Sequence, residues 1–125
     1  MNKEFVSYEQ AVALKELGFD EPCLARFFKV GDEKEIFIYF NTPSNENTDV
    51  TIIAPLKSQV FEWFREKHDL IYSIGYMGHS NTWAYEIINI SMPGPNYGYA
   101  QTYEEAEQAC LDELIKIVKN GNTRN

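Results

Sequence analysis

Six Tyr and Trp side chains gather in the second half of the sequence, and their chemistry suits the binding of a ligand or a partner. They are Tyr72, Tyr76, Trp83, Tyr85, Tyr97 and Tyr99. Tyr and Trp combine a large apolar ring with a polar group, so they serve protein interfaces and also stack on nucleobases. Each of them can equally be a core or dimer contact.

Basic side chains would complete such a site. The candidates are Arg26, Lys29, Lys57 and Arg65. A guanidinium holds a phosphate group with two hydrogen bonds. Arg26 and Arg65 are therefore predicted to join the six aromatic residues in a ligand-binding site for a nucleotide-like small molecule.

Acid–base chemistry would have to rely on His79 and Glu86. His79 stands beside Ser80 and Asn81 in a predicted turn, and a catalytic Ser–His pair needs a third group that orients it. Glu86 lies inside a predicted strand, where it either faces solvent or serves a polar site. A small enzyme that uses His79 and Glu86 is therefore the third hypothesis, and no catalytic residue is predicted.

The remaining motifs favour structural roles. His68 follows a predicted helix end, where a partly positive imidazole suits the helix dipole. Cys23 and Cys110 form no CxxC motif, so neither a metal site nor a redox pair is predicted. Walker, GxGxxG and HExxH sequences are absent, and no cofactor is predicted. The segment 93–99 (PGPNYGY) is either a flexible aromatic lid or an ordered loop that seals the core.

Composition limits the class of protein. The chain has 125 residues, of which 44% are hydrophobic and 14% aromatic, and a formal net charge of −8. This length predicts one globular domain over residues 1–120, followed by a frayed tail at 121–125. The acidic charge disfavours bulk nucleic acid as a partner. With no apolar signal core and no membrane-length apolar segment, the expected location is the cytoplasm.

Two helices with capping signals position these residues. Ser7 and Gln10 have the spacing of a capping box, and Gly18 is suited to end the first helix in the left-handed conformation. Phe19 would then fold back on Leu14. A second capping box, Thr102 with Glu105, opens the last helix, which is expected to end near Gly121. A central helix is expected to begin at Pro55 and to end near His68.

The rest of the sequence predicts strands and turns. Alternating apolar residues and Gly-containing turns indicate two hairpins and one short additional strand. The expected strands are 24–30, 35–41, 50–53, 70–76 and 82–90. The predicted fold class is α+β, a mainly antiparallel sheet of four to five strands with three helices, in the order α-β-β-(β)-α-β-β-α.

Three segments also resemble a known group of proteins. They are 5–23 (FVSYEQAVALKELGFDEPC), 61–70 (FEWFREKHDL) and 102–119 (TYEEAEQACLDELIKIVK). These segments resemble small uncharacterised α+β proteins that are carried by phages and mobile elements of gut anaerobes. The resemblance implies a shared scaffold and a phage or mobile-element origin, which would place the protein in the cytoplasm of the host cell. It carries over no catalytic residue.

These observations support two main hypotheses. The first is a non-enzymatic binding protein, for instance a counter-defence protein that sequesters a nucleotide-like host signal in a pocket, often between subunits of a homodimer or higher homo-oligomer. The alternative is an acidic protein–protein inhibitor that docks on a basic host protein.

Overall fold

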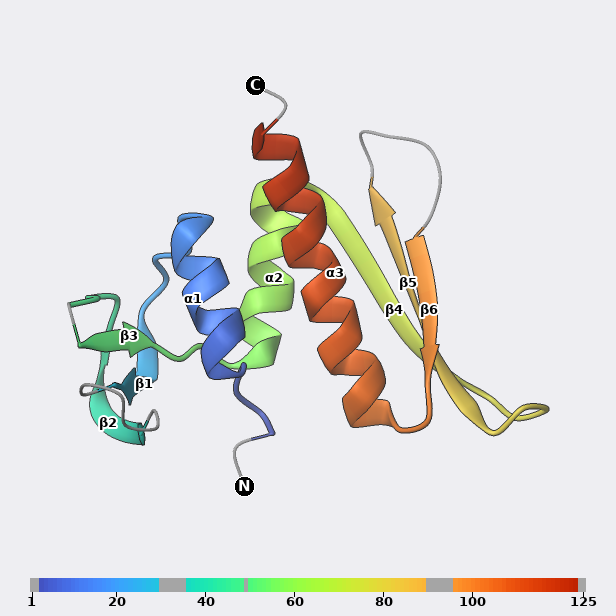
Figure 1. The fold of residues 1–125 in the computed structure, drawn as a ribbon, viewed down its shortest axis with the longest axis horizontal. Coiled ribbons are helices and arrows are strands. Elements are labelled where there is room, and N and C mark those ends of the chain that lie inside the picture. The colour runs from blue at the N-terminus through green and yellow to red at the C-terminus, as the bar shows by residue number, and fades with distance from the viewer. Residues whose placement is uncertain (1–2, 30–35, 49, 90–95, 124–125) are drawn as a thin grey trace. The chain divides into compact units, whose positions relative to one another are not determined.

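The computed structural model of the chain describes residues 3–29, 36–48, 50–89 and 96–123. They form three helices and six strands (Figure 1). The chain divides into two compact units, residues 1–60 and 61–125, with the boundary inside α2 (Lys57–His68). Each unit is described by itself.

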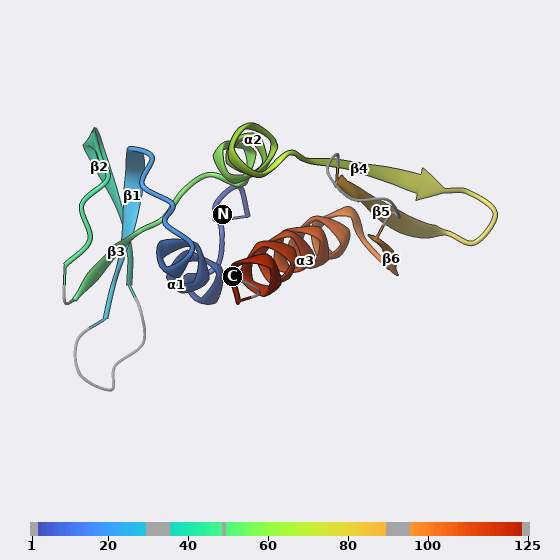
Figure 2. The same ribbon diagram turned by 90° about the horizontal axis from the view of Figure 1, so that it is seen from above.

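Unit 1 is a three-stranded antiparallel sheet with one helix. The strand order is β2-β1-β3, with β1 at Cys23–Phe28, β2 at Ile36–Ser44 and β3 at Thr51–Ile53. Helix α1 (Tyr8–Glu16) lies beside this sheet (Figure 2). The register pairs Phe27 with Phe37 on one side and with Ile52 on the other, so these three residues share the face of the sheet that carries the aromatic core.

Both ends of α1 form as the local sequence predicts. The amide of Gln10 donates to the Ser7 hydroxyl, and the amide of Ser7 donates to the Gln10 side chain, each at 3.1 Å. At the other end, Gly18 has a φ of 93°, and the amide of Phe19 donates to the Leu14 carbonyl at 2.9 Å. Leu14 and Phe19 are both buried. These contacts satisfy terminal backbone groups that would otherwise lack partners.

Aromatic rings fill much of the core of unit 1. Phe5 packs edge-on against Phe37 at a centroid distance of 4.9 Å and against Tyr39 at 5.6 Å. Phe27 contacts Phe37 at 5.6 Å. The chain near Phe5 is held by an isolated bridge to Leu56, which places the N-terminal segment against the start of α2.

Unit 2 is a second three-stranded antiparallel sheet, and α3 (Tyr103–Thr123) packs on one face of it. The order is β4-β5-β6, with β4 at Leu70–Met77, β5 at Thr82–Asn89 and β6 at Asn96–Ala100. Helix α3 contacts all three strands. The sheet contributes the buried side chains of Leu70 and Ile87 to the core of this unit. The buried residues of α3 are Ala106, Cys110, Leu111, Leu114, Ile115 and Val118.

The α+β class, the antiparallel pairing and the approximate element order are confirmed, with four differences. The strands form two separate three-stranded sheets, and β6 is a strand inside the segment that was expected to be irregular. Helix α2 begins at Lys57 rather than Pro55, and α3 continues past Gly121 to Thr123. The predicted hairpin loop 31–34 lies outside the described residues. The prediction of a single domain stays a prediction.

Candidate functional site

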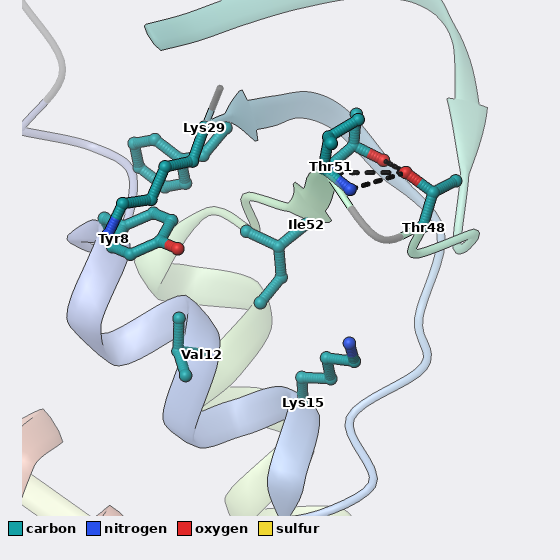
Figure 3. Close-up of a pocket in the computed structure, with 9 residues that line it drawn as sticks. Tyr8, Val12, Lys15, Lys29, Thr48, Thr51 and Ile52 are labelled. Atoms are coloured by element: carbon teal, nitrogen blue, oxygen red, sulfur yellow. Dashed lines mark hydrogen bonds between the residues drawn. The ribbon is translucent and has the colours of Figure 1, made fainter. Parts of the chain in front are cut away.

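A pocket of about 450 Å³ lies between α1 and the sheet of unit 1. Figure 3 shows its lining side chains. They combine apolar residues with hydroxyls and two lysines, and come from α1, from β1 and the residue after it, and from β3 and the segment before it. The lining residues are Tyr8, Val12, Lys15, Phe27, Lys29, Thr48, Val50, Thr51 and Ile52.

The base of the pocket is apolar because strand register and helix spacing converge there. Phe27 on β1 and Ile52 on β3 are register partners, and both are buried. Val12 lies one helical turn after Tyr8 and therefore on the same side of α1. The Tyr8 ring packs edge-on against Phe27 at a centroid distance of 5.7 Å. The apolar base is thus built by three elements of one unit.

Lys29 and Tyr8 form one side of the pocket. The Lys29 Nζ lies 5.4 Å from the centre of the Tyr8 ring, within reach of a cation–π attraction. The backbone amide of Lys29 donates to the Val50 carbonyl at 3.0 Å, which fixes the position of Lys29 just beyond β1. In Figure 3 the Lys29 side chain runs towards Tyr8. A positive charge is therefore held against an aromatic ring at the pocket wall.

Thr48 and Thr51 supply an oriented hydroxyl pair. The Thr48 Oγ1 accepts hydrogen bonds from the amides of Thr51 at 3.1 Å and Val50 at 3.3 Å. The two hydroxyl oxygens lie 2.6 Å apart. Either hydroxyl can donate in this bond, so one of the two hydroxyl protons stays available for another acceptor.

Lys15 brings the second positive charge. It stands in the last turn of α1, where the helix dipole also favours a cation. Figure 3 shows its side chain extending from the end of α1 along the pocket, on a different side from Lys29. None of the described residues that line the pocket is acidic. The described lining residues thus carry two positive charges and no negative charge, on a chain whose formal net charge is −8.

Arg26 lies outside this group. It stands on β1 next to Phe27, and alternate residues of a strand point to opposite faces. Its guanidinium donates to the hydroxyl of Ser44 on the edge strand β2. Arg26 therefore acts on the face of the sheet opposite the pocket.

The other predicted site residues belong to unit 2, and three of them are partly buried on the helix-covered face of its sheet. Tyr72 stacks on Phe61 at a centroid distance of 3.9 Å and an interplanar angle of 17°. Trp83 packs edge-on against Tyr103 of α3 at 5.3 Å. Burial raises the pKa of the Tyr85 phenol, and Glu113 of α3 raises it further. Tyr72, Trp83 and Tyr85 thus have packing roles.

The remaining members are exposed. Tyr97 and Tyr99 lie on the opposite face of the same sheet, with their rings 6.3 Å apart. Tyr76 lies at the end of β4, and its hydroxyl donates to the Asn81 side chain at 2.7 Å. Arg65 is on the surface of α2, where its guanidinium Nη2 lies 3.9 Å from the carboxylate Oε1 of Glu66. Of the seven predicted residues of unit 2, Tyr85, Tyr97 and Tyr99 line one hollow, and the other four are not among its described lining residues.

The acid–base candidates are also separated. Glu86 is exposed in the middle of β5, and His79 is exposed in the turn that precedes this strand. The four residue steps from Thr82 to Glu86 alone span roughly 13 Å of extended strand. A direct hydrogen bond between His79 and Glu86 is therefore not formed.

His68 and the two cysteines are buried or partly buried. Burial lowers the pKa of His68, whose ring packs edge-on against Trp63 at 4.8 Å, although Asp69 acts in the opposite direction. The expected partly positive imidazole is thus disfavoured by its environment. Burial raises the pKa of Cys23 and of Cys110 to about 12 in each case. Both thiols are free.

Three comparisons with known proteins give no guidance. Neither the models of protein families, nor the curated proteins, nor the solved structures contain a match to this chain. None of the helices in the described part of the chain is both long and apolar enough to cross a membrane. Within the same residues, no three His, Cys, Asp or Glu side chains are grouped as metal ligands would be.

Of the residues that line the pocket, only Lys29 was predicted from the sequence to take part in a binding site, as one of four basic candidates. Tyr8 was hidden because it opens a helix whose other residues are typical core and capping types. Thr48 belongs to a polar segment that was expected to be an exposed loop. These residues come from separate segments, so no linear spacing connects them, and only the strand register brings them to one place.

Proposed function

We propose that the protein is a non-enzymatic binding protein, and that the pocket of unit 1 holds a small anionic molecule with an aromatic body. The proposal rests on Lys15 and Lys29, which lie beside the apolar floor of the pocket. A nucleotide-like ligand would complement both features, because its phosphate can contact the two lysines and its nucleobase can contact the ring of Tyr8. The volume of about 450 Å³ lies in the range of small-molecule sites.

The polar groups support an anion over a cation or a neutral solute. Two ammonium groups and one hydroxyl of the Thr48–Thr51 pair are donors, and charge-assisted hydrogen bonds are the strong ones. The described lining residues include no carboxylate that would repel a phosphate. Val12 and Ile52 offer an apolar surface on which a base can lie while its phosphate reaches the donors.

Binding is favoured over catalysis by the same set of residues. None of the described lining residues is His, Cys, Asp or Glu, which supply most general bases and nucleophiles. The resemblance to phage and mobile-element proteins suggests a purpose for binding alone, namely the sequestration of a nucleotide-like host signal as a counter-defence.

Calorimetric titration with a panel of nucleotides tests the proposal. The panel consists of mononucleotides, cyclic nucleotides and ADP-ribose, with the corresponding nucleosides and inorganic phosphate as controls. At least one nucleotide should bind more tightly than both its nucleoside and phosphate, because the pocket contacts both halves. The proposal would be contradicted if no nucleotide gave a heat of binding and none changed the melting temperature of the protein.

A further inference from the structure

The open face of the unit 2 sheet is apolar where solvent exposure predicts polar residues. Successive residues of β5 point to opposite faces of the sheet. Ile87, on the face covered by α3, is 1% exposed, whereas Ile88, on the open face, is 47% exposed. Ile71, paired with Ile88, and the rings of Tyr97 and Tyr99 are exposed on this same face. An uncovered sheet face is normally polar, and exposed apolar patches on proteins mark interaction sites.

A hollow of about 410 Å³ lies in this face. Its base is formed by Gly75 and Ala84, which are register partners with little or no side chain. A Cβ added at Gly75 would meet no atom within 4 Å, so the space above the strand is open. Tyr99 pairs with Ala84, and Tyr97 pairs with Glu86, which places both rings and one carboxylate at the edge of the hollow.

These three side chains have the chemistry of a cation site. The rings of Tyr97 and Tyr99 lie 6.3 Å apart at an interplanar angle of 79°, so they present differently oriented π-surfaces. A cation within about 6 Å of a ring centroid is attracted to it. Glu86 is the one charged group among the described residues that line the hollow. An Arg or Lys side chain would satisfy its carboxylate and both rings together.

We propose that this face docks a basic, extended segment of a partner protein, and that Tyr97, Tyr99 and Glu86 hold one Arg or Lys side chain of that segment. The apolar pair Ile71 and Ile88 lies two residues further along the strands from Ser73 and Glu86, about 7 Å away. That spacing equals the repeat of an extended segment. An apolar residue two positions from the basic one would therefore contact Ile71 and Ile88.

Charge complementarity favours a basic partner over a second copy of this chain. The chain has a formal net charge of −8, so two copies repel each other, whereas a basic segment is attracted. A second copy would also bring no cation to Glu86 through the same face, since the described residues of the hollow include no Lys or Arg. This surface lies in unit 2 and does not depend on the proposed nucleotide pocket of unit 1.

Titration of the full-length, isotope-labelled protein with two synthetic peptides tests the docking surface. The first peptide carries arginine with valine two positions away on either side and serine elsewhere, and the second has citrulline in place of arginine. We expect the arginine peptide to shift the backbone amide signals of Ser73, Ala84 and Glu86, and to bind at least tenfold more tightly than the citrulline peptide. Equal binding of both peptides, or shifts confined to acidic positions of α3, would overturn the proposal.

Variants and further probes sharpen the test. Glu86→Gln and Tyr99→Ser should each weaken binding of the arginine peptide at least fivefold, while Glu104→Gln, a matched loss of one exposed carboxylate on α3, should weaken it less than twofold. Both site positions are exposed, and an unchanged amide spectrum outside the face will show that the variants are folded. Equal weakening by Glu86→Gln and Glu104→Gln would contradict the docking surface. If N-acetyl-arginine methylamide binds as tightly as the peptide, the hollow is a site for small cations and the proposal is wrong. The proposal is also contradicted if analytical ultracentrifugation shows a dimer that closes through this face.

Discussion

The ring of Tyr85 lies directly over Gly98 of the neighbouring strand. A Cβ atom at position 98 would be 2.6 Å from the Cε2 and Oη atoms of Tyr85 and 2.7 Å from its Cζ. The two residues are register partners on β5 and β6, on the face that α3 covers. A side chain at position 98 would therefore force the Tyr85 ring to move, and the contact helps to fix the register of β6.

Replacing Gly98 by alanine is expected to destabilise the protein by about 1–3 kcal/mol, because the Tyr85 ring must leave its packed position. Urea denaturation monitored by circular dichroism measures the change. In the background of Tyr85→Ala, which removes the ring, the same Gly98→Ala substitution should cost much less. Gly75→Ala is the matched control, since a Cβ there meets nothing within 4 Å. Equal losses for Gly98→Ala with and without the Tyr85 ring would contradict the packing relationship.

Two other glycines should respond to alanine with opposite signs. Gly18 has a φ of 93° at the end of α1, a conformation that disfavours a Cβ, so Gly18→Ala should reduce the unfolding free energy by about 1 kcal/mol. Gly121 lies inside α3 without a positive φ, so Gly121→Ala should raise helix stability by up to about 1 kcal/mol. Thermal denaturation of the two variants checks this. A stabilised Gly18→Ala variant would show that α1 does not end as described.

His68 should make stability depend on pH near neutrality. Burial lowers its pKa below the ordinary value of 6.5, so the unfolded chain takes up a proton more readily than the folded one. The unfolding free energy is therefore highest above pH 6.5 and decreases as the pH falls through 6.5 and then through the lower folded value. Denaturation at pH 7.5 and 5.5 should show this decrease, and His68→Gln should reduce it. The variant His79→Gln, which removes the exposed histidine of the β4–β5 turn, serves as the control. A wild-type protein more stable at pH 5.5 would contradict the assignment.

Cys23 and Cys110 should resist alkylation in the folded protein. Burial raises the pKa of both thiols to about 12, and only the thiolate is an effective nucleophile. With iodoacetamide at pH 8, mass spectrometry should find no alkyl group on the native chain and two on the chain unfolded in urea. Rapid addition of one group to the native protein would show that one of the thiols is accessible.

The sequence predicted best what depends on neighbouring residues. Ser7, Gln10 and Gly18 act within one helix and its end, so their spacing was sufficient to predict the capping box and the terminator. The strand over 82–90 was likewise predicted from its own residues, and β5 is found at Thr82–Asn89. In contrast, Pro and Gly around Asn96 obscured β6, because the strand is held by pairing with β5 and by the fit of Tyr85 over Gly98. Those relationships are not local in sequence.

The candidate site was hard to predict for a related reason. The aromatic residues from Tyr72 to Tyr99 lie close in sequence, but strand alternation divides them between the two faces of a sheet. The pocket residues Tyr8, Lys29 and Thr51 lie far apart in sequence and meet only through the β1–β3 register and the position of α1. Proximity in the chain therefore pointed to unit 2, whereas the pocket proposed to bind a small anion lies in unit 1.

The central claim is that Lys15 and Lys29 bind the anionic group of a ligand whose body rests near Tyr8. Calorimetry should therefore compare a binding nucleotide with its nucleoside, for the wild type, Lys15→Gln/Lys29→Gln and Tyr8→Leu. A charge-assisted hydrogen bond contributes about 1.5–3 kcal/mol, so the lysine variant should lose at least tenfold in affinity for the nucleotide and little for the nucleoside. Tyr8→Leu should weaken both ligands. The control Lys116→Gln/Lys119→Gln removes the same two charges from exposed positions of α3 and should change neither affinity by more than twofold. Nucleotide affinity that is the same in the wild type and the Lys15→Gln/Lys29→Gln variant would contradict the account.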